Sequence, residues 1–197
     1  GNSARGIAVC RQLSRDFGLH VFGVANAPSL VLSRTYTGDE APSRRTRAPD
    51  IAARLQQLSS RIRLLGLQGE VAFDGAEYIV RYLLRSAADA DSIVLDMNRV
   101  SIVSDSAARQ LHDARRLLIA EGRALVFSRI RGRAAIQGAL RRTLPEDDHG
   151  YLSFEDNDVA IEWCENRLLA AEGATPQGAT KLADFAILTG TTEADRA

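Results

Sequence analysis

Short apolar runs and helical stripes alternate along residues 61–172. The apolar runs are bounded by turn residues and predict strands over residues 62–67, 93–96, 124–127 and 151–154. Apolar residues that recur every three or four positions predict helices over residues 77–87, 106–121, 133–140 and 157–168. Gln68 and Gly69 predict a turn after the first strand. Strands that alternate with helices predict an α/β fold, in which helices pack on a parallel or mixed sheet.

The segment before this unit predicts one incomplete domain and one connector. Residues 1–26 carry a helical stripe and one strand, and these two elements cannot bury a core alone. They therefore belong to a larger domain. Residues 27–60 contain Pro28, Pro42 and Pro49 and predict a linker. Its arginine cluster at positions 44–47 is either an anion contact or part of a solvated linker, and the solvated linker is favoured. Apolar residues at helical spacing near its end predict one short helix.

The composition narrows the class of protein and its compartment. The formal net charge is +0, which gives no global attraction to nucleic acid or to an acidic membrane surface. No stretch approaches the roughly 20 apolar residues that a membrane helix needs. Cys10 and Cys164 lie far apart and predict free thiols of a reducing compartment, hence a cytoplasmic protein. The opening Gly1-Asn2-Ser3 predicts an internal piece of a longer protein.

The residues that usually carry catalysis or metal binding are scattered. His20, His112 and His149 have no second ligand at metal spacing, and His112 falls on the polar side of its predicted helix. We therefore expect no metal site and no cofactor. Acidic residues at positions 155, 156 and 158 are explained by helix capping and by the helix dipole.

An arginine-rich stretch follows the strand that ends at residue 127. Arg129, Arg131 and Arg133 lie where ligands tend to bind in α/β proteins, after the carboxyl end of a strand. They are candidates for contact with an anion or a nucleotide. A solvated surface balanced by the acidic residues that follow is the favoured alternative.

Residues 92–107 carry the most informative motif. A buried strand ends at Asp96, apolar residues follow at positions 100–103, and Ser104-Asp105-Ser106-Ala107 opens a helix. The motif and the order of elements resemble the STAS domain. That α/β fold occurs in anti-sigma-factor antagonists and in the cytoplasmic tails of sulfate transporters. The resemblance implies a mixed sheet with helices packed on it, and a non-catalytic regulatory or interaction role.

In the STAS family this helix begins Asp-Ser-Ser-Gly, and a partner kinase phosphorylates the first serine. Asp105 stands at that position, and a serine kinase cannot phosphorylate a carboxylate. Asp105 either mimics the phosphorylated state or caps the helix, and capping is favoured because Ser, Asp and Asn are ordinary N-caps. The resemblance makes Ser104, Asp105 and Ser106 the candidate surface for a partner.

Residues 1–22 resemble the carboxyl end of bacterial glutaminases, which have a serine-dependent β-lactamase-like fold and hydrolyse glutamine to glutamate and ammonia. The match covers about the first two dozen residues and is nearly continuous, with residues 1–10, 13–14 and 17–22 carrying it. The catalytic Ser-x-x-Lys motif of that family is absent, because the single lysine, Lys181, has Gly178 three positions before it. The chain itself is therefore predicted to be non-catalytic, within a parent glutaminase.

Some bacterial glutaminases carry a STAS domain and then a cyclic-nucleotide-binding domain, and residues 181–197 resemble the start of the latter. Thr191 stands where a leucine is usual. The predicted order is the end of a glutaminase domain, a linker, a STAS domain, a second linker and a cyclic-nucleotide-binding stub, over residues 1–26, 27–60, 61–172, 173–180 and 181–197.

Two alternatives stay open for the whole protein. A free-standing anti-sigma-factor antagonist would lack the opening helix and strand and would have a phosphorylatable residue at position 105. A sulfate-transporter tail would follow transmembrane helices. For the glutaminase interpretation we expect the catalytic domain in cis as a partner, together with a protein or nucleotide at the STAS domain. Homo-oligomers also fit this interpretation, whereas nucleic acid and membrane do not.

Overall fold

The structure is a computed structural model that describes residues 31–144 and 150–173. The described chain forms, in order, β1 (Leu32–Thr37), α2 (Pro49–Leu58), the 3-10 helix η1 (Ser59–Arg61), β2 (Ile62–Val71), α3 (Phe73–Ser86), β3 (Ser92–Val103), α4 (Asp105–Ala120), β4 (Ala124–Ser128), α5 (Ala134–Arg142), β5 (Ser153–Phe154) and α6 (Asn157–Ala171).

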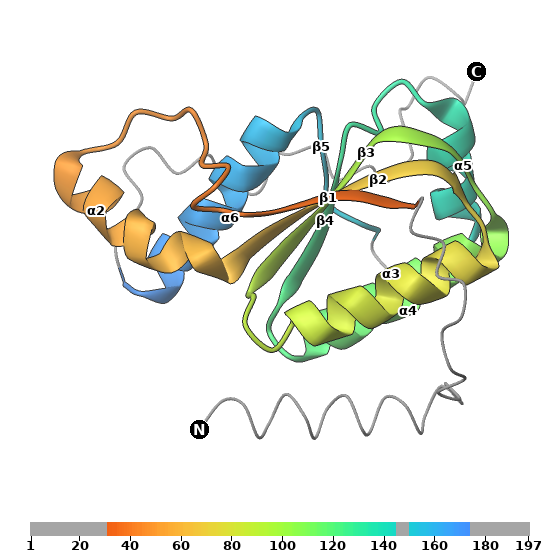
Figure 1. The fold of residues 1–197 in the computed structure, drawn as a ribbon, viewed down its shortest axis with the longest axis horizontal. Helices are drawn as coiled ribbons and strands as arrows, with labels where there is room; N and C mark the ends of the chain where they lie inside the picture. The colour runs from red at the N-terminus through yellow and green to blue at the C-terminus, as the bar shows by residue number, and fades with distance from the viewer. Residues whose placement is uncertain (1–30, 145–149, 174–197) are drawn as a thin grey trace, which may run out of the picture.

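The strands form one five-stranded sheet in the order β1-β2-β3-β4-β5 (Figure 1). β1 pairs antiparallel with β2, and every later neighbour is parallel. The parallel pairs need crossovers, and α3, α4 and α5 lie in the connections between them. The mixed α/β fold predicted from the sequence is confirmed.

The sheet is covered on both faces, by different helices. On one face α3, α4 and α5 pack against the main core, which includes Leu95 and Phe127. On the other face α6 packs against a smaller core that includes Val94 and Val126. Neighbouring residues of β3 and β4 are therefore buried on opposite faces. This explains why their sequences are continuous apolar runs rather than alternating patterns.

Two central strands are longer than predicted. β3 joins the predicted strand at residues 93–96 and the apolar residues at 100–103 into one element, and β2 continues through the predicted turn to Val71. Their pairing shifts register between Gly66 and Gln68 and again after Gly69, where φ is +72°. Such bulges absorb extra residues without ending a strand, so Gln68 and Gly69 do not form a turn.

The prediction of a solvated connector was wrong for its described part. Residues 32–37 form the edge strand β1, and Arg47 forms an ion pair with Glu165 on α6 at 2.9 Å. The two side chains are only 7% and 5% exposed. Arg45 pairs with Glu162 on the same helix. The arginine cluster therefore fastens residues 43–47 to α6, and the short helix predicted after it is α2.

His112 is buried, whereas the helical pattern places it on the polar side of α4. Its Nε2 lies 2.7 Å from the carbonyl oxygen of Leu140 on α5. α5 covers a face of α4 that the pattern alone leaves in solvent.

Cys164 is a free thiol as predicted, and burial raises its pKa to about 12.

Several predictions concern residues outside the described ranges. They include Cys10, His20, His149, the glutaminase-like residues 1–26 and the proposed stub at 181–197. The domain boundaries therefore stay predictions. Within the described ranges, no helix is both long enough and apolar enough to cross a bilayer.

Candidate functional site

The start of α4 is built by Ser104, which is the N-cap of the helix. Its Oγ accepts a hydrogen bond from the backbone N–H of Ala107 at 3.1 Å and lies 3.0 Å from Oγ of Ser106. Asp105 follows in the first turn, where its charge is favourable to the helix dipole. Its carboxylate forms an ion pair with Arg142 on α5 at 2.9 Å. The capping role expected for Asp105 therefore belongs to Ser104.

Two exposed apolar side chains lie at the same end of the domain as these residues. Phe73 opens α3 and is 55% exposed, and Ile102 near the end of β3 is 49% exposed. A backbone hydrogen bond of 3.0 Å from Ser104 to Val71 joins the two strand ends. We call Phe73, Ile102, Ser104, Asp105 and Ser106 the α4 surface. Exposed apolar residues beside polar ones are typical of protein contact surfaces.

Arg129, Arg131 and Arg133 were the candidates for contact with an anion. Their side chains extend in different directions. Arg133 donates hydrogen bonds to the carbonyl oxygens of Met97, Asn98 and Val100 and so supports the bulged end of β3. Arg131 is exposed and lies 3.4 Å from Glu155. Arg129 lines a cavity on the sheet, whose lining does not include Arg131 or Arg133. The structure does not bring them together.

The different environments of Arg133 and Arg131 predict different contributions to the free energy of unfolding. Arg133→Ala is expected to lower the free energy of unfolding by about 2–3 kcal/mol, because it leaves carbonyl groups at the end of β3 without their charged donor. Arg131→Ala is the matched control and is expected to change it by less than about 0.5 kcal/mol, as for other exposed ion pairs. Urea unfolding followed by circular dichroism measures both. Equal losses would contradict the structural role of Arg133.

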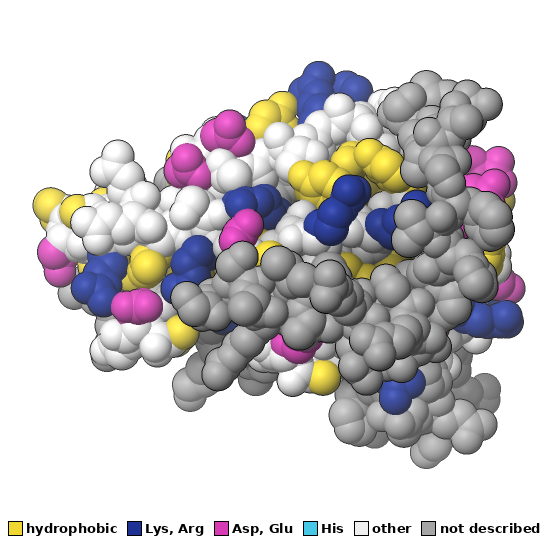
Figure 2. Space-filling view, turned by 60° about the horizontal axis from the view of Figure 1, so that its bottom comes forward, with side chains coloured by type: hydrophobic (Ala, Val, Ile, Leu, Met, Phe, Trp, Pro, Cys, Tyr) yellow, Lys and Arg dark blue, Asp and Glu magenta, His cyan; other side chains and the backbone are white. Residues whose placement is uncertain are grey.

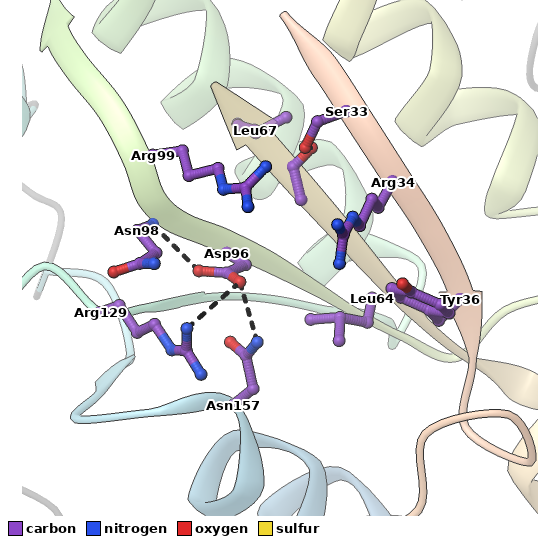
Figure 3. Close-up of a pocket in the computed structure, with 11 residues that line it drawn as sticks. Ser33, Arg34, Tyr36, Leu64, Leu67, Asp96, Asn98, Arg99, Arg129 and Asn157 are labelled. Atoms are coloured by element: carbon purple, nitrogen blue, oxygen red, sulfur yellow. Dashed lines mark hydrogen bonds and ion pairs between the residues drawn. The ribbon is translucent and has the colours of Figure 1, made fainter. Parts of the chain in front are cut away.

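The cavity has a volume of about 260 Å³ and lies on the α6 side of the sheet, beyond the start of that helix. Its polar lining comes from β1, β3, the loop after β4 and α6, and it includes Arg34, Tyr36, Asp96, Arg99, Arg129 and Asn157. Figure 3 shows the side chains of Arg34, Arg99 and Arg129 arranged around Asp96. We call this space the arginine cavity.

Asp96 is held in place at the floor of the arginine cavity. One carboxylate oxygen accepts from the backbone N–H of Asn98 at 2.9 Å, and the other accepts from Nδ2 of Asn157 at 2.9 Å. Asn157 is itself oriented by Ser128, whose Oγ lies 2.6 Å from Asn157 Oδ1. Arg129 lies 4.0 Å from the carboxylate. The position of Asp96 is therefore set by three separate elements.

Sequence reasoning identified Arg129 and missed the other members of the arginine cavity. Asp96 ends an apolar run in a predicted strand, and this is the signal that could have found it, since ligands favour the carboxyl ends of parallel strands. Arg34 carries no local signal, because β1 was not predicted. Arg99 lies between the predicted strand at 93–96 and the apolar residues at 100–103, in a part of β3 that was not predicted as strand. No group of three or more His, Cys, Asp or Glu side chains suited to a metal occurs among the residues that the structure describes.

A family model described as the STAS domain matches residues 55–143, which include β2, β3, β4 and the helices between them. Residues 55–143 form a STAS domain. Its α4 begins with the Ser104-Asp105-Ser106 motif, and the arginine cavity lies across the sheet from that helix, on the α6 side. Basic and acidic side chains are interspersed on the face that Figure 2 shows.

Two curated relatives are bacterial glutaminases of Bradyrhizobium diazoefficiens. Glutaminase 1 is 27% identical over 192 residues, which cover 96% of this chain and 31% of that protein. Glutaminase 2 is 27% identical over 168 residues, which cover 85% of this chain and 27% of that protein. This chain therefore spans less than a third of either relative.

Among solved structures, the anti-sigma factor antagonist SpoIIAA in its unphosphorylated form is similar to this chain. It is 15% identical, and the match covers 52% of this chain and 88% of SpoIIAA with a TM-score of 0.42.

Proposed function

We propose that this chain is the regulatory part of a cytoplasmic glutaminase, and that its STAS domain is a non-catalytic interaction module. The observation that carries the proposal is the extent of the match to Glutaminase 1. It covers 96% of the chain, and so extends well beyond the STAS domain on both sides. A free-standing antagonist or a transporter tail would be expected to share the STAS domain alone. In the same proposal, residues 181–197 begin a cyclic-nucleotide-binding domain.

The α4 surface is the part of the STAS domain that best fits a partner. It combines two exposed apolar side chains with an exposed carboxylate, Asp105, at the position of the family's phosphoserine. A carboxylate there supplies negative charge without phosphorylation, so the surface would not depend on a kinase to become charged. The proposed partner is the glutaminase catalytic domain of the same protein or of a second copy.

Glutaminase activity of the full-length protein tests this proposal, compared with a version that lacks everything after Pro28. We expect the deletion to change kcat, KM or the oligomeric state. Asp105→Ala and Asp105→Ser should change whichever of these properties the deletion changes, in the same direction as the deletion. Asp89→Ala is the matched control, because Asp89 is exposed in the turn at the opposite end of α3.

Three results would contradict the proposal. Absence of glutaminase activity in the full-length protein would contradict the assignment of this chain to a glutaminase. Unchanged kinetics and assembly after the deletion would remove the regulatory role. Release of ammonia from glutamine by this chain alone would contradict a non-catalytic module.

A further inference from the structure

The arginine cavity is left open by the way α6 crosses the sheet. α6 packs over Leu64, Val94 and Val126, but the next residues on the same face, Gly66 and Asp96, line the cavity instead. A glycine and a carboxylate thus stand where apolar side chains would continue the core. The opening is therefore a polar depression in a sheet face that is otherwise packed.

The charges around this depression are unbalanced. Three guanidinium groups face one carboxylate, which leaves two positive charges in excess. Arg129 lies at 4.0 Å from Asp96. Within residues 31–144 and 150–173, no carboxylate oxygen lies within 4.0 Å of the guanidinium group of Arg34 or of Arg99. Arginines on three separate elements therefore converge without a matching set of acidic groups (Figure 3).

The backbone of Arg129 adds a second, independent observation. Its φ is +59°, and it is the one described residue other than glycine with a positive φ. Such a conformation is uncommon for a long side chain and is found preferentially at binding sites and switches. Here it turns the chain directly after β4, so that the arginine side chain lies beside Asp96.

We propose that the arginine cavity binds a small organic molecule that carries two negative charges on carboxylate or phosphate oxygens, together with a hydroxyl or ammonium group. Two excess positive charges match two negative charges, and planar guanidinium groups bind carboxylate and phosphate oxygens in pairs. The fixed carboxylate of Asp96 retains lone pairs for a donor on the ligand. A volume of about 260 Å³ suits a ligand smaller than typical drug-sized molecules.

Dicarboxylic acids and phosphate monoesters share this chemistry. The inference does not depend on the proposed function, because it concerns binding by this chain alone. Isothermal titration calorimetry of the 197-residue chain with L-malate, L-glutamate and glycerol 3-phosphate tests it. Succinate has the charge of L-malate without its hydroxyl group, and it isolates the part played by Asp96. The class of probe that binds with the lower Kd, dicarboxylic acid or phosphate monoester, identifies the anionic group that the cavity prefers.

We expect at least one of the three donor-bearing probes to bind with a Kd below about 1 mM. Arg34→Gln and Arg99→Gln should each weaken binding by about tenfold or more, since each removes a charge-assisted contact. Both side chains are exposed on their strands, so the variants should fold, which circular dichroism checks. Arg131→Gln is the matched control, because Arg131 lies outside the cavity, and it should change the Kd by less than about twofold.

Three results would overturn the inference. The first is that no donor-bearing probe binds with a Kd below about 1 mM. The second is binding that Arg34→Gln and Arg99→Gln leave unchanged. The third applies when L-malate binds, and it is an equal affinity for succinate, which would show that Asp96 receives no donor from the ligand.

Discussion

A chain that begins at residue 61 is expected to lose cooperative unfolding or to aggregate, although the sequence predicts residue 61 as the start of the STAS domain. The deletion removes β1 and leaves the edge of β2 without its antiparallel partner. An unpaired strand edge is a template for association with other chains. The deletion also removes Arg47 and so leaves the buried carboxylate of Glu165 without its cation.

The size of the expected loss of stability follows from the buried charge of Glu165. Leaving one member of a buried ion pair alone costs about 3–5 kcal/mol, which is a large part of the 5–15 kcal/mol that stabilises a typical domain. Urea unfolding, followed by circular dichroism and by size-exclusion chromatography, compares the chain from residue 61 to 173 with the chain from 31 to 173. Equal midpoints for the two chains would show that β1 and the residues after it contribute nothing to the fold.

Glu165→Ala is expected to lower the free energy of unfolding by about 3–5 kcal/mol. The carboxylate accepts hydrogen bonds from the backbone N–H of Ser43 at 2.9 Å and from its Oγ at 2.6 Å, and from Arg47 at 2.9 Å. The substitution leaves the guanidinium group of Arg47 buried with one side-chain partner, Asn166 at 2.9 Å. Thermal and urea unfolding both measure the loss.

Glu172→Ala is the matched control for this prediction. Glu172 follows α6 and also pairs with an arginine of the segment before β2, Arg54 at 2.8 Å, but these side chains are 51% (Arg54) and 34% (Glu172) exposed. The expected loss is below about 1 kcal/mol. The double variant Arg47→Met, Glu165→Leu should recover part of the loss, since an apolar pair leaves no buried charge, although the hydrogen bonds from Ser43 stay unmade. A loss as large for Glu172→Ala as for Glu165→Ala would contradict the importance of burial.

These two predictions connect stability to the proposed functions. α6 carries Glu165 in its third turn and Asn157 in its first, and Asn157 orients Asp96 in the arginine cavity. The ion pair that holds residues 43–47 on α6 therefore also helps to position one wall of the cavity. Disruption of this ion pair is expected to weaken ligand binding as well as folding.

The sequence by itself determined the features that depend on neighbouring residues. The apolar runs of β3 and β4 predicted buried central strands, because a strand covered on both faces needs apolar residues at successive positions. Asp156 was predicted as the cap of the last helix, and its carboxylate accepts from the backbone N–H of Val159 at 2.9 Å. Such contacts lie within one helical turn, so the local pattern is sufficient to predict them.

The tertiary structure alone decided the edge strand, the buried ion pair and the arginine cavity. β1 is only partly covered, so its sequence lacks the apolar pattern by which strands are recognised. Arg47 and Glu165 are 118 positions apart, and the arginines around Asp96 come from β1, from β3 and from the loop after β4. These contacts depend on sheet order, on register with its bulges and on the path of α6. No local periodicity records those properties, because each is set by packing between distant segments.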